Sequence, residues 1–591
     1  MVLLSLIPQI HLWIVRGRDW NGAYVGPYGD ELLYAAYVNS LIDGRTRKND
    51  PYGAKDDSAD APLPESFFSI QFVPAYAIAL PARTFGVSVA TAFIVVIAMA
   101  GLLASLSVFW LLNSLTGDHR VAAAGTIFVL CLGCAVGRYG LFGTFVDIGF
   151  PALPFLRRYQ PAVAFPLFFI FQLLVWRALA SENKRRAWVL AFVAGLTLAT
   201  LIFSYLYLWT AAAAWLACIG PLWFYFRPAE RRKTLALLAM IGVLTVIALV
   251  PYVYLVSQQA AIQDEHLIII SSHRPDLFRV HEIFGAIILV VLVIGALRHR
   301  IKLTESRAIY AVSLALLPFI VFNQQVLTGK TLQAFHFEMF AINYSTLVGL
   351  LIMVTLFWKR VPRRFLILIA ASSFAWGVVV VGLPSRLLFV PWAVSNDQGI
   401  PVLRRLKELS KQDGTLADLR TKGQASTLVF SPSVPLIAQL PSWTSQGTLL
   451  DVTGTYCSSQ TRDQQKELFY MHLYYSNVQK ESLRKALRNA PEESVDALSN
   501  ARTVIFGHQR VFRYLSPEFE PIRDEEVERE AESYLLFANS FSRAEVLKRP
   551  LTYAIVASDS SFDFSKLDRW YERDVGERVG AYTLYRLKLR N

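Results

Sequence analysis

The chain has 591 residues, of which 54% are hydrophobic and only 17% are charged. Soluble domains carry about one quarter charged residues, so this composition excludes an ordinary soluble protein and predicts a membrane protein. The formal net charge of +13 indicates lysine and arginine side chains held on the cytoplasmic side of a membrane. It does not indicate a nucleic-acid partner.

Apolar segments recur through the first two thirds of the chain and predict about eleven transmembrane helices. They lie at residues 1–15, 87–113, 121–138, 161–180, 187–205, 208–226, 234–256, 281–297, 308–323, 340–358 and 365–383. The first segment is short for a span, and we expect its true start to lie a few residues upstream. No internal repeat accompanies these segments.

The connections between these segments alternate in charge and set the orientation. Short basic connections occur at 119–120, 184–186, 227–233, 298–307 and 359–364. By the positive-inside rule they face the cytoplasm. The N-terminus is therefore expected inside and the loops at 16–86, 139–160, 257–280 and 324–339 outside. Within the first of these loops, a semi-apolar helix around 67–80 is expected to lie in the membrane interface, because it carries Phe67, Phe68, Phe72 and Tyr76. The protein is predicted to be a multi-pass membrane protein with its N-terminus in the cytoplasm.

The composition changes after the last apolar segment. From about residue 395 the apolar runs are short and charges are frequent. Runs at 427–430, 503–506, 553–556 and 582–587 predict strands, and 464–487 predicts helix. The predicted fold class is an α-helical polytopic membrane domain, 1–394, followed by an extracytoplasmic soluble α/β domain, 395–591. We expect this second domain to be a lid or a partner-binding module.

Two consecutive carboxylates, Asp30 and Glu31, open a helical pattern in the first external loop, which ends at Asp43-Gly44. The helix dipole favours an ionised carboxylate at this end, so the pair offers a candidate general base. The alternative is an acidic N-cap that only stabilises the helix. Consecutive residues point about 100° apart on a helix and chelate one ion poorly. No metal site is therefore predicted, although a divalent metal stays open as a cofactor.

Arg157 and Arg158 break the positive-inside rule, because they lie in the second external loop just before a helix begins. An arginine pair at the bilayer surface is a good receptor for a lipid-linked phosphate. The alternative is an ion pair with Asp147 or contact with a lipid headgroup. Lys330, in the last long external loop, is expected to add charge at the same phosphate.

Further polar side chains in the external loops are candidate substrate-binding residues. Asp147 and Tyr159 lie in the second external loop, and Gln333 and His336 lie before the tenth span. Such side chains form hydrogen bonds to sugar hydroxyls and phosphates.

A long first external loop that opens with an acidic pair, many apolar spans and an external C-terminal domain together resemble the GT-C superfamily of membrane glycosyltransferases. The protein O-mannosyltransferases and aminoarabinose lipid A transferases belong to this superfamily. The motif that carries the resemblance is D-E-x-x-Y-x-A…D-G, here Asp30, Glu31, Tyr34, Ala36, Asp43 and Gly44. The resemblance covers the topology of residues 1–383, and the C-terminal tail lies outside it.

The resemblance implies a polyprenyl-phosphate sugar as donor and a first-loop carboxylate as general base, which only Asp30, or else Glu31, matches here. It places the phosphate-binding arginine at Arg157 or Arg158 by position. The expected reaction is inverting transfer of a hexose or pentose to a glycan, lipid or protein acceptor on the outer face of a bacterial-type cytoplasmic (inner) membrane.

Other functions stay open at this stage. A transporter or flippase for lipid-linked saccharides predicts ionisable residues at mid-bilayer, whereas Arg138 and Arg177 lie toward span ends. A non-catalytic cell-envelope assembly protein would act through its external domain. An oligosaccharide polymerase or ligase would use the same class of chemistry.

Overall fold

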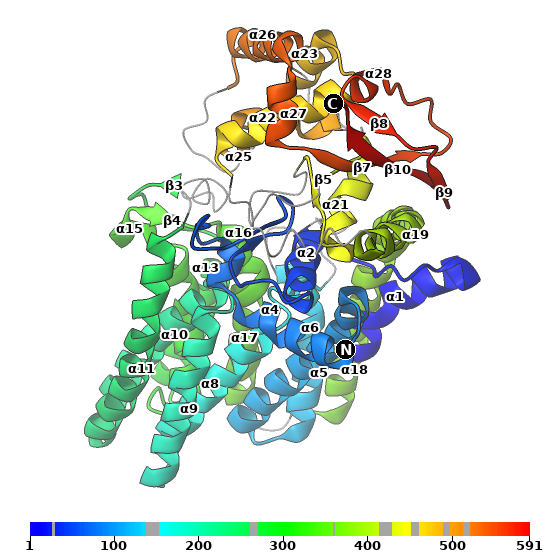
Figure 1. Ribbon diagram of the computed structural model, residues 1–591. Helices are drawn as coiled ribbons and strands as arrows, with labels where there is room; N and C mark the ends of the chain where they lie inside the picture. Colours follow the sequence, from blue (N-terminus) through cyan, green and yellow to red (C-terminus); the bar gives the residue numbers. More distant parts are fainter. Residues whose placement is uncertain are drawn as a thin grey trace.

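The computed structural model describes residues 1–26, 30–136, 153–259, 270–358, 361–412, 428–450, 460–488, 497–511 and 521–591. Asp147 and Arg138 lie outside these ranges. Figure 1 shows a bundle of long helices with a smaller mixed α/β part stacked on one end.

The bundle is built from helices that coincide with the predicted apolar segments. They are α1 (Val2–Arg16), α5 (Val89–Thr116), α6 (His119–Val136), α8 (Ala164–Ala180), α9 (Lys184–Ile202), α10 (Leu206–Phe226), α11 (Arg231–Ser257), α13 (Val280–Leu297), α14 (Ser306–Val321), α17 (Asn343–Phe357) and α18 (Arg363–Pro384). Each of the eleven predicted segments therefore contains a helix.

The prediction of eleven full spans is confirmed only in part. Among the described residues, seven helical stretches are long and apolar enough to cross a membrane, and three more apolar helices are shorter. Helix α1 belongs to neither group. It buries Gln9, whose side-chain amide donates to the backbone oxygen of Ala23 at 3.2 Å and accepts from the backbone nitrogen of Val25 at 3.0 Å.

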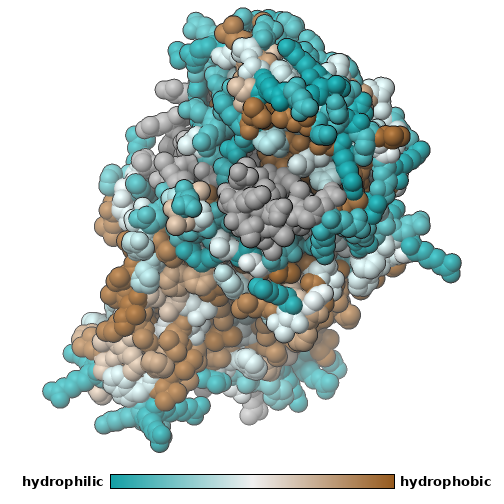
Figure 2. All heavy atoms as spheres, in the orientation of Figure 1, coloured by the Kyte–Doolittle hydropathy of each residue, from teal (hydrophilic) through white to brown (hydrophobic). Residues whose placement is uncertain are grey.

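The surface of the bundle supports a membrane location. Figure 2 shows a broad hydrophobic belt over the bundle, with hydrophilic side chains above it and at the far helix ends. Helix α11 exposes many apolar side chains, among them Val246, Val250 and Val253. The chain is therefore a multi-pass helical membrane protein. Its orientation stays a prediction.

The loop at 16–86 forms a compact layer at one end of the bundle. Its elements are α2 (Asp30–Ile42), β1 (Asn49–Asp50), β2 (Lys55–Asp56), α3 (Phe67–Ile70) and α4 (Val73–Phe85). The α2 helix is confirmed and begins at Asp30, as predicted. The interfacial helix expected at 67–80 is interrupted at Gln71. Ser66 caps the short α3 because its hydroxyl accepts from the backbone nitrogen of Ser69.

Helix α2 is buried on all sides, from Glu31 to Leu41. The α/β part covers one side of it through α21 (Val434–Trp443). The Asn39 amide donates to the backbone oxygen of Pro441 at 3.1 Å, and the Ser442 hydroxyl donates to the backbone oxygen of Leu32 at 3.2 Å. The helix that begins at Asp30 is therefore held between the bundle and the α/β part.

The α/β part contains a six-stranded sheet in the order β6-β5-β7-β10-β8, with β9 also pairing with β10. Its strands are β5 (Leu428–Phe430), β6 (Gly447–Thr448), β7 (Leu551–Ala557), β8 (Tyr571–Arg573), β9 (Glu577–Val579) and β10 (Tyr582–Leu589). Pairing of β5 with β6 and β7 is parallel, and β10 pairs antiparallel with its neighbours. The strands predicted at 427–430, 553–556 and 582–587 are confirmed.

The strand predicted at 503–506 is wrong, because these residues belong to α24 (Ala501–Phe506). Ala501 and Ile505 lie one helical turn apart, and both are buried in the same apolar cluster. This packing outweighs the β propensity of the local sequence. The helix predicted at 464–487 is two helices, α22 (Arg462–Tyr475) and α23 (Lys480–Arg488). They are separated at Asn477, whose φ is +53°.

The two parts are joined by an unbroken helical run from α18 through a π-helical turn, Ser385–Phe389, into α19 (Val390–Gln412). The predicted domain boundary at 394/395 falls within α19. There, the fully buried carboxylate of Asp397 accepts from the Arg16 side chain at 2.9 Å. It also accepts from the backbone nitrogens of Asn21 and Ala23, each at 3.0 Å. This carboxylate fixes the start of the first loop.

Candidate functional site

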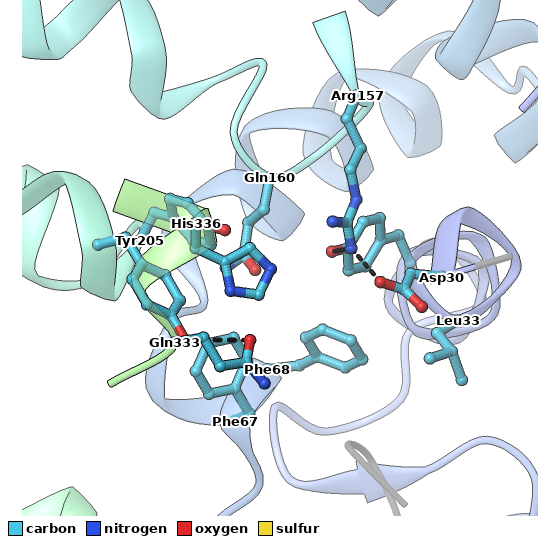
Figure 3. A pocket seen from close by; sticks show the side chains of 11 residues that line it. Asp30, Leu33, Phe67, Phe68, Arg157, Gln160, Tyr205, Gln333 and His336 are labelled. Carbon is cyan, nitrogen blue, oxygen red and sulfur yellow. Dashed lines mark hydrogen bonds and ion pairs between the residues drawn. The ribbon is translucent and has the colours of Figure 1, made fainter. Parts of the chain in front are cut away.

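A cavity lies where several loops meet at one end of the bundle (Figure 3). Its lining residues are Asp30, Leu33, Tyr34, Phe67, Phe68, Arg157, Gln160, Tyr205, Tyr207, Gln333 and His336. They come from α2, α3, the segment after a 3₁₀ turn, η2 (Pro154–Leu156), the start of α10, and the loop that contains α16 (Ala334–Phe337). A mostly aromatic cavity with a few convergent polar groups is typical of a small-molecule site.

One wall of the cavity holds an ion pair between Asp30 and Arg157 (Figure 3). The same terminal nitrogen of Arg157, Nη2, donates to the Asp30 carboxylate and to the Tyr34 hydroxyl. The Arg157 side chain is 8% exposed, whereas the Asp30 side chain is 43% exposed. The guanidinium is therefore fixed in the wall, and the carboxylate faces the open side.

Tyr34 explains why this geometry forms. It lies one helical turn after Asp30, so both side chains share one face of α2. Its ring stacks on Tyr159, with centroids 4.8 Å apart, and meets the edge of Phe68 at 5.5 Å. The Arg157 guanidinium lies 5.2 Å from the Tyr34 ring centroid. These aromatic contacts hold Arg157 beside the first residue of the helix.

The neighbouring pair, Glu31 and Arg158, lies behind this wall. Arg158 Nη1 donates to the Glu31 carboxylate at 2.8 Å, and the Arg158 backbone nitrogen donates to the same group at 3.2 Å. The Arg158 side chain also donates to the backbone oxygens of Val25 at 2.6 Å and Phe93 at 3.1 Å. Both side chains are 1% exposed. Burial raises the pKa of the Glu31 carboxyl, and the adjacent Arg158 opposes that rise.

The opposite wall of the cavity is polar and aromatic. The Tyr207 hydroxyl donates to the Gln333 side-chain oxygen at 3.4 Å. The Gln160 amide donates to the Gln71 side chain at 2.8 Å and to the backbone oxygen of Ser204 at 2.9 Å. The His336 ring lies 4.5 Å from the Tyr207 ring, centroid to centroid. In the described part of the chain, the buried His336 Nδ1 has no hydrogen-bond partner.

The structure brings four of the predicted site residues to this cavity: Asp30, Arg157, Gln333 and His336. Glu31, Arg158 and Tyr159 are buried outside its lining. Lys330 is exposed on β4 (Lys330–Thr331), which pairs with β3 (Ile270–Ser271), and it is not a lining residue. Asp147 lies outside the described residues. The roles assigned to all of these side chains stay predictions.

Most of the aromatic lining was not predicted from the sequence. Phe67 and Phe68 were interpreted as membrane-interface residues, and Tyr34 appeared only within the family motif. Tyr205 and Tyr207 lie at the start of α10, directly after its short connection to α9, and an aromatic pair at such a turn was the available signal. Gln160 was also missed, although it directly follows the arginine pair and Tyr159.

Within the ranges that the structure describes, no group of three or more His, Cys, Asp or Glu side chains is placed to hold a metal ion. Asp30 and Glu31 diverge, as their adjacent helical positions predict. Each carboxylate meets a different arginine. The described residues therefore contain no carboxylate cluster that fits a divalent cation.

No protein-family model matches the chain, and no curated protein matches it either. Solved structures of the oligosaccharyltransferase of Archaeoglobus fulgidus are similar to it at low identity. The apo form has 13% identity and a TM-score of 0.45, covering 94% of this chain and 69% of that one. The form in complex with an inhibitory peptide and a dolichol-phosphate has 13% identity and a TM-score of 0.44, covering 94% and 68%.

A third structure of that oligosaccharyltransferase, tethered to an acceptor peptide, has 12% identity and a TM-score of 0.45, covering 100% of this chain and 73% of the other. A likeness at these levels carries no functional argument. A function for this chain is therefore inferred from its own side chains.

Proposed function

We propose that the protein is a membrane glycosyltransferase that moves a sugar from a polyprenyl-phosphate donor to an acceptor hydroxyl. The observation that carries this proposal is the Asp30–Arg157 pair, which sets a carboxylate and a guanidinium side by side on an aromatic cavity. The cavity lies in a protein with a hydrophobic belt (Figure 2), so a lipid-linked substrate can keep its tail in the membrane.

The lining suits each part of such a donor. A guanidinium offers several donors in a fork that matches phosphate oxygens. The rings of Phe67, Phe68 and Tyr205 offer apolar surface to a sugar ring. The side chains of Gln333 and His336 offer hydrogen bonds to sugar hydroxyls. Arg157 is therefore assigned to the phosphate, and the opposite wall to the sugar.

The proposed reaction is a direct displacement. Asp30 accepts the proton of the acceptor hydroxyl, and the acceptor oxygen forms a bond to the anomeric carbon. The bond from that carbon to the phosphate oxygen breaks, and its electron pair leaves with the lipid phosphate, which Arg157 stabilises. Attack opposite the leaving group inverts the anomeric configuration. Asp30 is preferred to Glu31 because the Glu31 carboxylate is buried against Arg158.

The finer parts of the proposal concern place and partners. We propose that the cavity opens on the outer face of a bacterial-type cytoplasmic membrane, with a glycan, lipid or protein as acceptor. The α/β part is proposed to act as a cover for α2, which it contacts through α21. In this proposal Lys330 makes no direct contact with the phosphate, because it does not line the cavity.

The test is transfer of radiolabelled sugar from a panel of polyprenyl-phosphate sugars, in membranes that contain the parent chain or Asp30→Asn. The parent is expected to transfer one sugar of the panel. Asp30→Asn is expected to lose about 10²–10⁴-fold in rate, the usual contribution of a general base. The matched control is Asp43→Asn, at the other end of the same helix. Equal transfer by the parent and by folded Asp30→Asn would exclude Asp30 as the base.

A further inference from the structure

The proposed phosphate-binding residue, Arg157, and the proposed base, Asp30, form an ion pair with each other. Arg157 Nη2 donates to the Asp30 carboxylate. A phosphate and a carboxylate are competing acceptors for one guanidinium, because both offer anionic oxygens to the same donors. Both side chains line the same cavity, so a phosphate bound to Arg157 there would lie beside Asp30 (Figure 3).

Building on the proposed function, we infer that the donor phosphate displaces the Asp30 carboxylate from Arg157, so that the base is released only when the donor is bound. While the two side chains are paired, a carboxylate oxygen of Asp30 is occupied by Arg157 Nη2. When the phosphate takes over Arg157, that oxygen is free to accept a hydrogen bond from the acceptor hydroxyl beside the sugar. The acceptor hydroxyl is therefore activated only after the donor has bound.

Arg157 is held by more contacts than Asp30, and this difference decides which of the two side chains moves. Arg157 is 8% exposed, donates to Tyr34 and packs over its ring. Asp30 is the first residue of α2 and is 43% exposed. Rotation of the carboxylate into the cavity breaks one ion pair and exposes it to solvent. Rotation of the guanidinium would break its buried contacts as well, so Asp30 is the partner that leaves.

The neighbouring pair cannot open in this way. Glu31 accepts from both the side chain and the backbone nitrogen of Arg158, and both side chains are 1% exposed. A phosphate has no access to Arg158 from the cavity, because that residue does not line it. The exchange of partners is therefore specific to Asp30 and Arg157.

The same competition between carboxylate and phosphate restores the starting ion pair after sugar transfer. After transfer, Asp30 carries the proton of the acceptor hydroxyl, and the lipid phosphate, which left with the electron pair of the broken bond, lies on Arg157. Asp30 then gives its proton to water and pairs again with Arg157. Because the carboxylate and the phosphate compete for the guanidinium, this step favours release of the lipid phosphate.

The test measures binding of farnesyl monophosphate to the full-length protein in detergent. Asp30→Asn and Asp30→Ala remove the competing charge and are expected to bind this probe about 2- to 5-fold more tightly than the parent, the range of a partly exposed ion pair. The matched control, Asp43→Asn, is expected to bind like the parent. Arg157→Met is expected to lose binding. Unchanged or weaker binding by both Asp30 variants would overturn the inference.

Sugar transfer by the same preparations separates this inference from the proposed function. Tighter binding together with lost transfer supports both. Lost transfer with unchanged probe binding overturns the displacement and keeps the proposed base. Full transfer by folded Asp30→Asn overturns the proposed base, whatever the binding. A folded parent chain that does not bind the probe overturns the phosphate site, and the displacement with it.

Discussion

The two ion pairs formed by consecutive residues, Asp30 with Arg157 and Glu31 with Arg158, show how one short motif serves two purposes. In the first pair the carboxylate is 43% exposed and faces a cavity. In the second, both side chains are 1% exposed and hydrogen-bonded to backbone atoms as well. Adjacent helical positions point about 100° apart, so the same acidic pair meets open space on one side and packed protein on the other. The first pair is suited to chemistry and the second to stability.

The largest expected effect concerns the buried pair. Glu31→Gln leaves the Arg158 guanidinium buried without its counter-charge, which typically costs about 3–5 kcal/mol in the free energy of unfolding. Unfolding followed in detergent measures this loss. The double variant Glu31→Gln with Arg158→Met removes both charges and is expected to recover much of it. If Glu31→Gln were as stable as the parent, the structural role assigned to the buried pair would be wrong.

The next effect concerns the exposed pair and the proposed phosphate site. Arg157→Lys keeps the charge but loses the planar fork of the guanidinium. We expect transfer to fall about 10- to 100-fold, from the loss of one or two charge-assisted hydrogen bonds. The initial rate at fixed donor concentration measures this change, with the unfolding midpoint as control for folding. Transfer at the parent rate would show that Arg157 does not hold the phosphate.

A smaller effect is expected on the wall opposite the pair. Tyr207→Phe keeps the ring and removes the hydroxyl that donates to Gln333 at 3.4 Å. Since one hydrogen bond contributes about 0.5–1.5 kcal/mol, KM for the donor is expected to rise about 2- to 10-fold, with kcat changing less. Tyr225→Phe, on an exposed part of the same helix α10, is the matched control. An unchanged KM would show that the hydrogen bond between Tyr207 and Gln333 does not contribute to sugar recognition.

The smallest expected effect is on the stability of the exposed pair, and it distinguishes the two ion pairs most clearly. Asp30→Asn breaks an ion pair whose carboxylate is half exposed, and such pairs contribute about 1 kcal/mol or less to stability. Its free energy of unfolding is therefore expected to stay within about 1 kcal/mol of the parent value. The same unfolding assay as for Glu31→Gln measures it. A loss as large as that of the buried pair would mean that Asp30 is a structural residue.

The sequence predicted the helices of this molecule better than it predicted their packing. Apolar segments and the start of α2 at Asp30 follow from local patterns. The strand expected at 503–506 failed because Ala501 and Ile505 pack as one face of α24. The pairing of Arg157 with Asp30 was not predicted, because the two residues lie 127 positions apart in the chain. The phosphate predicted for the arginine pair stays a proposal.

Several polar residues of the candidate site were predictable, whereas its aromatic lining was not. Asp30 and Arg157 stood out because one opens a helix and the other violates a charge rule. Nothing local indicates that Glu31 and Arg158 turn away from the cavity, since that depends on how α2 is rotated between the bundle and α21. The aromatic lining was missed because tyrosine and phenylalanine at helix ends are also typical of a membrane interface.

The most direct test of the central claim is the single-turnover rate of sugar transfer by folded Asp30→Asn protein at saturating donor, beside the parent. Saturation removes any difference in donor binding, so the rate reports the chemical step alone. The account predicts a loss of at least about 100-fold, in a variant that unfolds at nearly the parent free energy. A rate within a few-fold of the parent would contradict it and would reduce Asp30 to the acidic start of a buried helix.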